Sequence, residues 1–477
     1  MSEHVTTLYE RRDAFTSMDT ELLIVGGGPA GYSAAIRAGQ RGLDVTLVAD
    51  GAVGGTCLNH GCIPSKALLT ATGRVQSVET AQEMGIYVEP YVDVAEMAAW
   101  KDGVVDRLTS GVEQLCAANG VDVIDGFARF EDEHTVSVDG SSEITFEAAI
   151  VATGSRPVSL PGFDFDDEPI LDSRQALALD AAPPRLLVVG AGYIGMELST
   201  VFARLGSDVT VVEMLDGPLP QYDDELTAPV VEAATDLGID FNFGEAASGW
   251  RSTGRGVVVT TETETGETFD YDADRVLVAV GREPVTAGLN LDALGLETDE
   301  RGFLETDDLG RTDRDHVFAV GDVAGEPMLA HKGVHEGLVA AAAAAGDGEP
   351  PSSRAVPSVV FTAPEIATVG LDPDEARDRG IDPVVGRFPF SASGRALTTG
   401  EPRGFVRLVA KADGRVVGGQ VVGPEASELI AEIGLAVEAE LSLADVAETI
   451  HAHPTLSEAT MEAAEHALGR AIHTLNR

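Results

Sequence analysis

An α/β fold with two Rossmann-like dinucleotide-binding domains and a C-terminal α+β region is predicted for this chain by three observations. Two glycine-rich turns with the pattern Gly-x-Gly-x-x-Gly each lie between a short apolar run and a helix-like segment. The two units form an internal repeat, which implies two different dinucleotides. The chain has 477 residues, more than one hydrophobic core usually fills, so further domains are expected.

The first βαβ unit starts at the apolar run of residues 21–25 and continues into the turn GGGPAG at 26–31. A helix-like segment then leads to a second apolar run at 45–48. The glycines of the turn are expected to supply, in order, a tight turn, a close backbone approach to a pyrophosphate, and close packing of helix on strand: Gly26, Gly28 and Gly31.

The second unit consists of an apolar run at 186–189, the turn GAGYIG at 190–195 and a strand-like run that ends at Glu213. Glu213 follows the first turn glycine by 213 − 190 = 23 residues, the spacing at which a carboxylate accepts hydrogen bonds from ribose hydroxyls. Because an added phosphate would be repelled there, we expect NAD rather than NADP. The turn glycines are Gly190, Gly192 and Gly195.

The first unit lacks an acidic residue at the matching position. The same spacing counted from Gly26 reaches Ala49, and the next residue is Asp50. We therefore expect Asp50 to reach the ribose of the first dinucleotide.

Two cysteines stand in the stretch GGTCLNHGCIPSK at residues 54–66, directly after the first unit. Two thiols as close as Cys57 and Cys62 can cycle between dithiol and disulfide through a mixed disulfide with a substrate. The alternatives are a buried pair or half of a zinc site. A zinc site needs four ligands, and the third cysteine, Cys116, has no motif around it.

The rest of the chain alternates helix-like and strand-like segments. Residues 67–120 are expected to be largely helical, and 121–150 to form short strands. After an Ala-rich helix at 333–345, the third region has strands around 357–370 and 404–422, followed by helices and the segment HAHPTLSE at 451–458. Three buried strands are expected to end at glycine turns: near Gly154, near Gly281, and near Gly321 with Asp322 after it.

The charge is strongly acidic, with 79 Asp and Glu against 32 Lys and Arg and a net charge of −47. Such a charge repels nucleic acid and anionic membranes, so we expect neither as a partner. Acidic residues spread over the whole length indicate a salt-rich cytoplasm, as in a halophile. Three cysteines, no secretory signal and no apolar run of about 20 residues also indicate a reducing, cytoplasmic location.

Five motifs in chain order resemble those of the pyridine nucleotide-disulfide oxidoreductases: GGTCLNHGCIPSK, ATGSRP, GAGYIGME, VFAVGD and HPTLSE. The resemblance implies FAD on the first unit, NAD on the second, and a C-terminal domain that pairs two chains into a homodimer. The expected domains are an FAD-binding domain at 19–155, an NAD-binding domain at 156–282, a return segment of the FAD/central domain at 283–350 and a dimerisation domain at 351–477.

The resemblance also implies an activity, the oxidation of dihydrolipoyl groups with reduction of NAD⁺ through a redox-active disulfide and FAD. The substrate would be a lipoyl-bearing protein or free dihydrolipoamide. Cys57 would be the interchange thiol, which attacks a substrate disulfide, and Cys62 the charge-transfer thiol beside the flavin. Lys66 would lie by the flavin, paired with Glu197.

The same resemblance assigns the general base and the cofactor ligands. His453 would be the base, contributed by the other subunit and oriented by Glu458. FAD would be held by Gly26, Gly28, Gly31, Asp50, Thr56, Lys66, Thr153, Gly154, Gly321 and Asp322. NAD would be held by Gly190, Gly192, Gly195, Glu213 and Gly281, and no metal is expected.

Other interpretations stay open. Thr455 and Glu458 also have the spacing of a helix capping box, which would make Glu458 structural. The chain could instead be an NAD(P)H-dependent reductase of a low-molecular-weight disulfide or a metal ion, or a redox-sensing flavoprotein without turnover. The absence of a C-terminal cysteine pair disfavours the metal reductase, and intact thiols, base and nucleotide units disfavour the sensor.

The charge count predicts dependence on salt. Diluting the enzyme from molar KCl to about 0.1 M lengthens the Debye length from about 3 Å to about 10 Å, so unpaired carboxylates repel one another. We expect dissociation of the dimer with or before loss of FAD, measured by light scattering beside the activity. Full activity and an unchanged dimer after hours in low salt would contradict this interpretation of the acidic surface.

Overall fold

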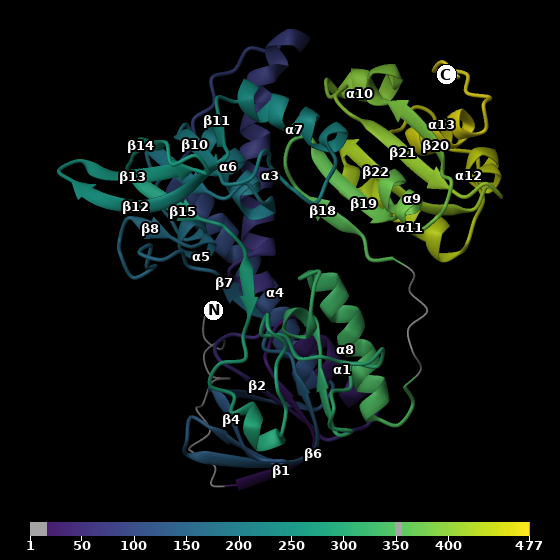
Figure 1. Cartoon of the computed structure of the whole chain (residues 1–477). Coiled ribbons are helices and arrows are strands. Elements are labelled where there is room, and N and C mark those ends of the chain that lie inside the picture. The colour runs from purple at the N-terminus through teal and green to yellow at the C-terminus, as the bar shows by residue number, and fades with distance from the viewer. Residues whose placement is uncertain (1–16, 349–354, 477) are drawn as a thin grey trace, which may run out of the picture. The chain divides into compact units, whose positions relative to one another are not determined.

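The computed structural model describes residues 17–348 and 355–476, and these form two compact units (Figure 1). Residues up to Pro64, Trp100–Pro157 and the segment from Arg282 make up the first unit. The second unit contains Ser65–Ala99, Val158–Gly281 and the C-terminal part of the chain. Within the described ranges, no helix combines the length and the apolar character needed to span a membrane.

A seven-stranded sheet forms the centre of the first unit. Residues 22–25, 45–49, 149–151 and 317–319 of its parallel strands are buried, which explains why these stretches are almost entirely apolar. Helices α1 (Pro29–Gln40) and α8 (Ala330–Ala344) pack side by side against this core (Figure 1). The strand order is β3 (Val121–Asp125), β2 (Val45–Ala49), β1 (Ser17–Val25), β6 (Ser142–Val151), β5 (Thr135–Val138) and β4 (Ala128–Asp132), with β17 (Val317–Ala319) also paired to β6.

Shorter elements of the first unit lie at the ends of these strands. A small antiparallel pair joins β7 (Ser155–Pro157) to β16 (Arg282–Pro284). The remaining elements are the short helix α2 (Gly55–Asn59) and the 3₁₀ turns η2 (Leu291–Leu294) and η3 (Gly321–Ala324). The longer helices α3 (Cys62–Thr80) and α4 (Val94–Ala118) each run across a boundary between the two units.

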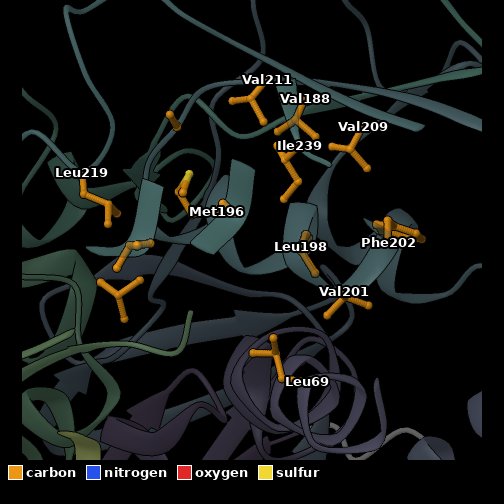
Figure 2. Close-up of a cluster of buried hydrophobic side chains, with 14 of the residues drawn as sticks. Leu69, Val188, Met196, Leu198, Val201, Phe202, Val209, Val211, Leu219 and Ile239 are labelled. Carbon is orange, nitrogen blue, oxygen red and sulfur yellow. The ribbon is translucent and has the colours of Figure 1, made fainter. Parts of the chain in front are cut away.

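The second unit begins with another parallel sheet, in the order β11 (Asp240–Phe243), β10 (Asp208–Glu213), β9 (Arg185–Val189), β15 (Arg275–Val278) and β8 (Ile170–Leu171). Figure 2 shows Val188, Val209 and Val211 of this sheet facing side chains of helix α6 (Tyr193–Arg204) in one apolar cluster, with Leu69 of α3. Burying each such side chain contributes about 1.5–3 kcal/mol. The other elements are α5 (Ser173–Leu177), α6 (Tyr193–Arg204), α7 (Asp224–Asp236), η1 (Ala81–Met84) and an antiparallel sheet of β12 (Glu245–Thr253), β13 (Gly256–Thr263) and β14 (Thr268–Ala273).

An antiparallel sheet with helices on it forms the C-terminal part. Its order is β18 (Ser358–Val360), β19 (Glu365–Gly370), β22 (Val416–Gly423), β21 (Phe405–Ala410) and β20 (Val384–Pro389). Buried residues of this sheet and of helices α11 (Ala426–Glu438) and α13 (Glu458–Ala467) share a separate apolar core. The helical elements are α9 (Pro373–Asp378), η4 (Phe390–Ala392), α10 (Gly394–Thr399), α11 (Ala426–Glu438), α12 (Leu443–Glu448) and α13 (Glu458–Ala467).

The predicted fold class is confirmed, with both βαβ units and the C-terminal α+β region in their expected places. Residues 67–120 are largely helical, as expected, with an interruption at 85–93. The strand expected to end near Gly281 ends at Val278. The four-part domain division stays a prediction.

The two glycine-rich turns adopt the same conformation. Gly28 precedes α1 with φ −72° and ψ −179°, and Gly192 precedes α6 with φ −71° and ψ −179°. A Cβ atom added to Gly31 would lie 1.8 Å from the Gly26 carbonyl oxygen, and one added to Gly195 would lie 2.0 Å from the Gly190 carbonyl oxygen. Only glycine lets each helix pack this closely on its turn.

We expect Gly31→Ala and Gly195→Ala each to disturb its own turn, because the backbone must move to admit the methyl group. Gly31→Ala should lower the FAD content of the purified protein, and Gly195→Ala should weaken NADH binding while FAD stays bound. Gly103→Ala is the matched control, since an added Cβ meets nothing within 4 Å in helix α4. Unchanged cofactor binding in both turn variants would show that the close packing is not needed.

Candidate active site

The two motif cysteines lie on consecutive helices and both belong to the first unit. Cys57 is in α2 and is half-buried, whereas Cys62 is the first residue of α3 and is exposed. The free amide groups of a helix N-terminus stabilise negative charge, so the position of Cys62 favours its thiolate. The third cysteine differs, because burial, with the charge of Glu113, raises the pKa of Cys116 to about 11. Cys116 belongs to the core around α1.

The cysteine loop is fastened directly to the first glycine-rich turn. The Gly54 amide donates to the Gly27 carbonyl at 2.8 Å. A Cβ atom on Gly55 would lie 2.6 Å from Gly28 Cα, and Gly54 and Gly55 both have positive φ, 109° and 55°. Only glycines can make this approach. Cys57, two residues further on, is therefore held beside the turn that is expected to bind a pyrophosphate.

Asn59 holds the cysteine loop together, a role that sequence reasoning missed. Its amide nitrogen donates to the carbonyls of Val53 at 3.2 Å and Gly55 at 3.1 Å. Its oxygen accepts from the Thr109 hydroxyl of α4 at 3.1 Å. An amide side chain offers both donors and an acceptor, which suits a residue that must satisfy several groups of one turn. In the sequence, only the position of Asn59 between the two cysteines could have indicated this role.

The first turn is open where a pyrophosphate would approach. A Cβ atom on Gly26 would lie 2.2 Å from the Ala152 carbonyl, so the turn lies against the segment that follows β6. Gly28 has nothing within 4 Å of its Cβ position, and no side chain caps α1. No capping side chain therefore accepts from the amides of the first helical turn of α1, and a phosphate could accept from them instead. The residues present fit FAD at this site.

Other residues predicted to hold FAD surround the same turn. Thr153 donates to the Val285 carbonyl at 2.6 Å, and Gly154, with φ 73°, has open space around its Cβ position. Gly321 lies against α1, since its Cβ would be 3.1 Å from Ala30 Cβ. Thr56 is exposed at the start of α2. These residues come from distant parts of the sequence and meet in the first unit.

Asp322 is positioned by a short network. One of its carboxylate oxygens accepts from the Ser155 hydroxyl at 2.5 Å, and Ser155 in turn accepts from Arg282 Nε at 2.8 Å. The Gly321 amide donates to Glu336 of α8 at 2.8 Å, which fixes the turn before it. The second oxygen of Asp322 keeps its capacity to accept from a ligand hydroxyl.

The expected ribose ligand of the first unit is exposed. Strand β2 ends at the buried Ala49, and Asp50 follows on the surface. The neighbouring Gly51 amide donates to Asp125 at the end of β3, at 3.1 Å. Asp50 as ribose ligand stays a prediction.

The second turn repeats the open geometry of the first. A Cβ atom on Gly190 would lie 2.6 Å from the Ala279 carbonyl, whereas the Cβ positions of Gly192 and Gly281 have nothing within 4 Å. Gly281 has a φ of 139°. The amides that begin α6 again have no capping side chain, so the turn fits a second dinucleotide.

Glu213, the last residue of β10, has a structural role that its spacing did not reveal. It is 8% exposed, and its two oxygens accept from the Ala191 amide at 2.7 Å and the Leu215 amide at 2.9 Å. The carboxylate thus stabilises the glycine-rich turn itself. Each carboxylate oxygen has a further lone pair, so a ribose hydroxyl can still donate to it.

Lys66 and Glu197 form the ion pair that was predicted. Lys66 Nζ lies 2.7 Å from Glu197 Oε2, and Glu197 is almost fully buried in α6. The other Glu197 oxygen accepts from the Phe361 amide at 3.0 Å, and Lys66 Nζ lies 4.4 Å from the centre of the Phe361 ring. A cation over an aromatic face is stabilised by the ring quadrupole. The role of Phe361 was not visible in the sequence.

His453 and Glu458 lie in direct contact. His453 Nδ1 is 2.9 Å from Glu458 Oε1, and the other Glu458 oxygen accepts from the Thr455 amide at 2.9 Å. Partial burial raises the pKa of Glu458, but the Thr455 amide and the His453 ring lower it more, so its pKa lies below the ordinary value. Glu458 therefore stays ionised and orients the ring.

Only half of the predicted capping box is present, because Glu458 accepts from the Thr455 amide but Thr455 is not the N-cap of the helix. Helix α13 begins at Glu458 itself with Ser457 as its N-cap, so Glu458 is the first helical residue rather than the third. Thr455 lies before the helix, and its hydroxyl donates to the Ala452 carbonyl at 2.7 Å. The Glu458 carboxylate closes the loop that carries His453.

The predicted site residues form groups that belong to two different units of the structure. The cysteines and the predicted FAD ligands other than Lys66 belong to the first unit. Lys66 with Glu197, the predicted NAD ligands, and His453 with Glu458 belong to the second unit. Among the described residues, no group of three or more His, Cys, Asp or Glu could hold a metal ion.

Comparison with protein families gives two matches that cover most of the chain. Residues 20–337 match the pyridine nucleotide-disulphide oxidoreductase family, and residues 356–464 match its dimerisation domain. A dihydrolipoyl dehydrogenase of Halobacterium salinarum is 61% identical over 97% of this chain and 99% of its own. A dihydrolipoyl dehydrogenase of Haloferax volcanii is 58% identical over 96% of this chain and 98% of its own.

Solved structures agree with this assignment. LpdA from Mycobacterium tuberculosis has a TM-score of 0.87 and 31% identity, covering 94% of this chain and 99% of its own. The HOCl-induced flavoprotein disulfide reductase RclA from Escherichia coli has a TM-score of 0.84 and 27% identity, covering 93% and 99%. The predicted resemblance is confirmed, including its link to halophilic relatives. This chain belongs to the pyridine nucleotide-disulphide oxidoreductase family, which uses FAD and NAD.

Proposed function

We propose that this chain is an enzyme that oxidises dihydrolipoyl groups to lipoyl groups and reduces NAD⁺ to NADH. The observation that carries the proposal is the cysteine pair fastened to a dinucleotide-binding turn through Gly54 and Gly55. It is supported by relatives named dihydrolipoyl dehydrogenase at 58–61% identity over nearly the whole chain. A redox pair needs an electron acceptor beside it, and the open first turn offers a place for FAD.

The base is prepared by hydrogen bonding. Because the ionised Glu458 carboxylate can only accept, Nδ1 of His453 carries a proton and donates a hydrogen bond to Glu458. Nε2 is then the basic nitrogen, and the side chain is 80% exposed. His453 thus takes a proton from the incoming dithiol and makes the thiolate that attacks.

Disulfide exchange completes the first half of the reaction. The substrate thiolate attacks the Cys57 sulfur of the Cys57–Cys62 disulfide, and the bond between the two cysteines breaks with the electrons on Cys62. The second substrate thiol displaces Cys57, so a lipoyl disulfide leaves and two cysteine thiols remain. The substrate has lost two electrons and two protons.

The second half uses the cofactors. FAD, when bound, supplies the relay that passes the two electrons to NAD⁺ as hydride. Gly28 and the amides of α1 would hold its pyrophosphate, and Asp322 its sugar-alcohol chain. Lys66, held by Glu197 and Phe361, would place a fixed positive charge by the flavin. Gly192 and α6 would hold NAD.

The assembly we propose is a homodimer in which His453 serves the cysteines of the partner chain. The support is the family dimerisation domain at residues 356–464, which contains both His453 and Glu458. The dithiol would come from a lipoyl-bearing protein or from free dihydrolipoamide. The cytoplasmic location stays a prediction from composition.

Three variants test the reaction. Cys57→Ser should abolish turnover of dihydrolipoamide with NAD⁺, and Cys62→Ser should keep FAD but remove the long-wavelength absorbance of the two-electron-reduced enzyme. His453→Gln should lower the rate by about 10² to 10⁴ with FAD content intact, the usual worth of a positioned base. Cys116→Ala is the matched control and should stay active, because this thiol lies in the core.

The competing functions give different results in the same assay. A low-molecular-weight disulfide or metal-ion reductase would turn over NADH or NADPH with its acceptor faster than dihydrolipoamide with NAD⁺. A sensor would bind FAD without turnover. A loss of less than threefold in His453→Gln, or a persistent long-wavelength band in Cys62→Ser, would remove that residue from the mechanism.

A further inference from the structure

The loop between α12 and α13 presents its two histidines in opposite ways. The His453 side chain is 80% exposed, whereas the His451 side chain, two residues earlier, is only 5% exposed. Ile450, directly before His451, is 97% exposed. His451 is therefore turned inward from a surface loop, and its ring must find partners inside the protein.

Both ring nitrogens of His451 face oxygen atoms. Nδ1 lies 2.8 Å from the Thr449 carbonyl oxygen, and Nε2 lies 2.7 Å from Glu432 Oε1. A carbonyl oxygen only accepts, so Nδ1 carries a proton. Nε2 faces a carboxylate oxygen, which likewise accepts, so Nε2 donates to Glu432 and the two side chains form an ion pair.

Glu432 gives this pair a rigid anchor. It lies in the middle of α11, and its neighbours Ile430 and Ile433 are buried in the C-terminal core. The His451 ring thus ties the loop to a packed helix on one side of His453. On the other side, Glu458 at the start of α13 accepts from the Thr455 amide and so ties the loop to that helix. His453 stands between two fixed points.

We propose that His451 is a positioning residue, whose ion pair with Glu432 holds the loop so that the His453 ring keeps its contact with Glu458. This inference rests on the proposed function, because it assigns a task to the same loop. His451 touches neither the reacting atoms nor a cofactor in this account, and it acts through the backbone. Burial has the largest effect on the pKa of Glu458 and raises it. The Thr455 amide and the His453 ring lower this pKa, and the charge of His451 lowers it by a smaller amount.

The ion pair is tested with His451→Gln, Glu432→Gln and the double variant. Each single variant should lower kcat for dihydrolipoamide oxidation by about 10-fold, less than loss of the base itself, with little change in the KM for NAD⁺. The double variant should be no worse than either single one, because both remove the same interaction. A fully multiplicative loss would overturn the pairing.

A second measurement separates positioning from general damage. Oxidation of NADH by ferricyanide needs the bound flavin but neither the cysteine exchange nor the base, so it should stay at the wild-type rate in all three variants. Equal loss of both activities, or loss of FAD, would show a merely structural role and overturn the proposal. His473→Gln is the matched control, because His473 pairs with Glu462 at 2.5 Å in the same unit and should be neutral in both assays.

The outcomes also separate this inference from the proposed function. If wild-type enzyme does not oxidise dihydrolipoamide, the proposed function fails. If the wild type oxidises it and His453→Gln is impaired while His451→Gln is not, only the positioning role of His451 fails.

Discussion

The chemistry of this protein depends on one close contact between two glycine-rich segments. Gly54 donates a hydrogen bond to Gly27, and Gly55 packs on Gly28 where no side chain could fit. The turn thus has one side open toward a pyrophosphate and another occupied by the loop that carries Cys57. Any larger residue at this contact would separate the thiol from the nucleotide site. Glycine is required here by the approach of two backbones.

Three carboxylates hold the functional side chains and the second glycine-rich turn in place. A carboxylate that is mostly buried stabilises backbone amides on one side and orients a functional group on the other. Glu197 binds the Phe361 amide and Lys66, and Glu458 binds the Thr455 amide and His453. Glu213 accepts from the Ala191 amide of the glycine-rich turn and from the Leu215 amide after β10, and keeps lone pairs for a ribose. The negative charge of each carboxylate is thereby stabilised by hydrogen bonds within the protein, whether or not a ligand is bound.

Local patterns in the sequence were enough to predict the elements that carry the site. Glycine spacing identified both βαβ units, because the turn, the close approach and the packing each demand glycine within a few residues. Residues whose partners are distant in sequence were not predictable in this way. Asn59, Phe361 and the Glu432–His451 pair depend on contacts that only the folded chain brings together. Glu458 was ambiguous, because its spacing from Thr455 fits a capping box while the family resemblance makes it the partner of His453.

We infer that the Cys57–Cys62 pair and a bound FAD form one redox unit. An anaerobic reductive titration of the FAD-loaded enzyme, followed through the flavin absorbance, tests it most directly. We expect the first two electrons per chain to yield a species with long-wavelength absorbance and largely unbleached flavin, because the thiol pair accepts them. Bleaching of the flavin in proportion from the first addition, without the long-wavelength band, would contradict the claim.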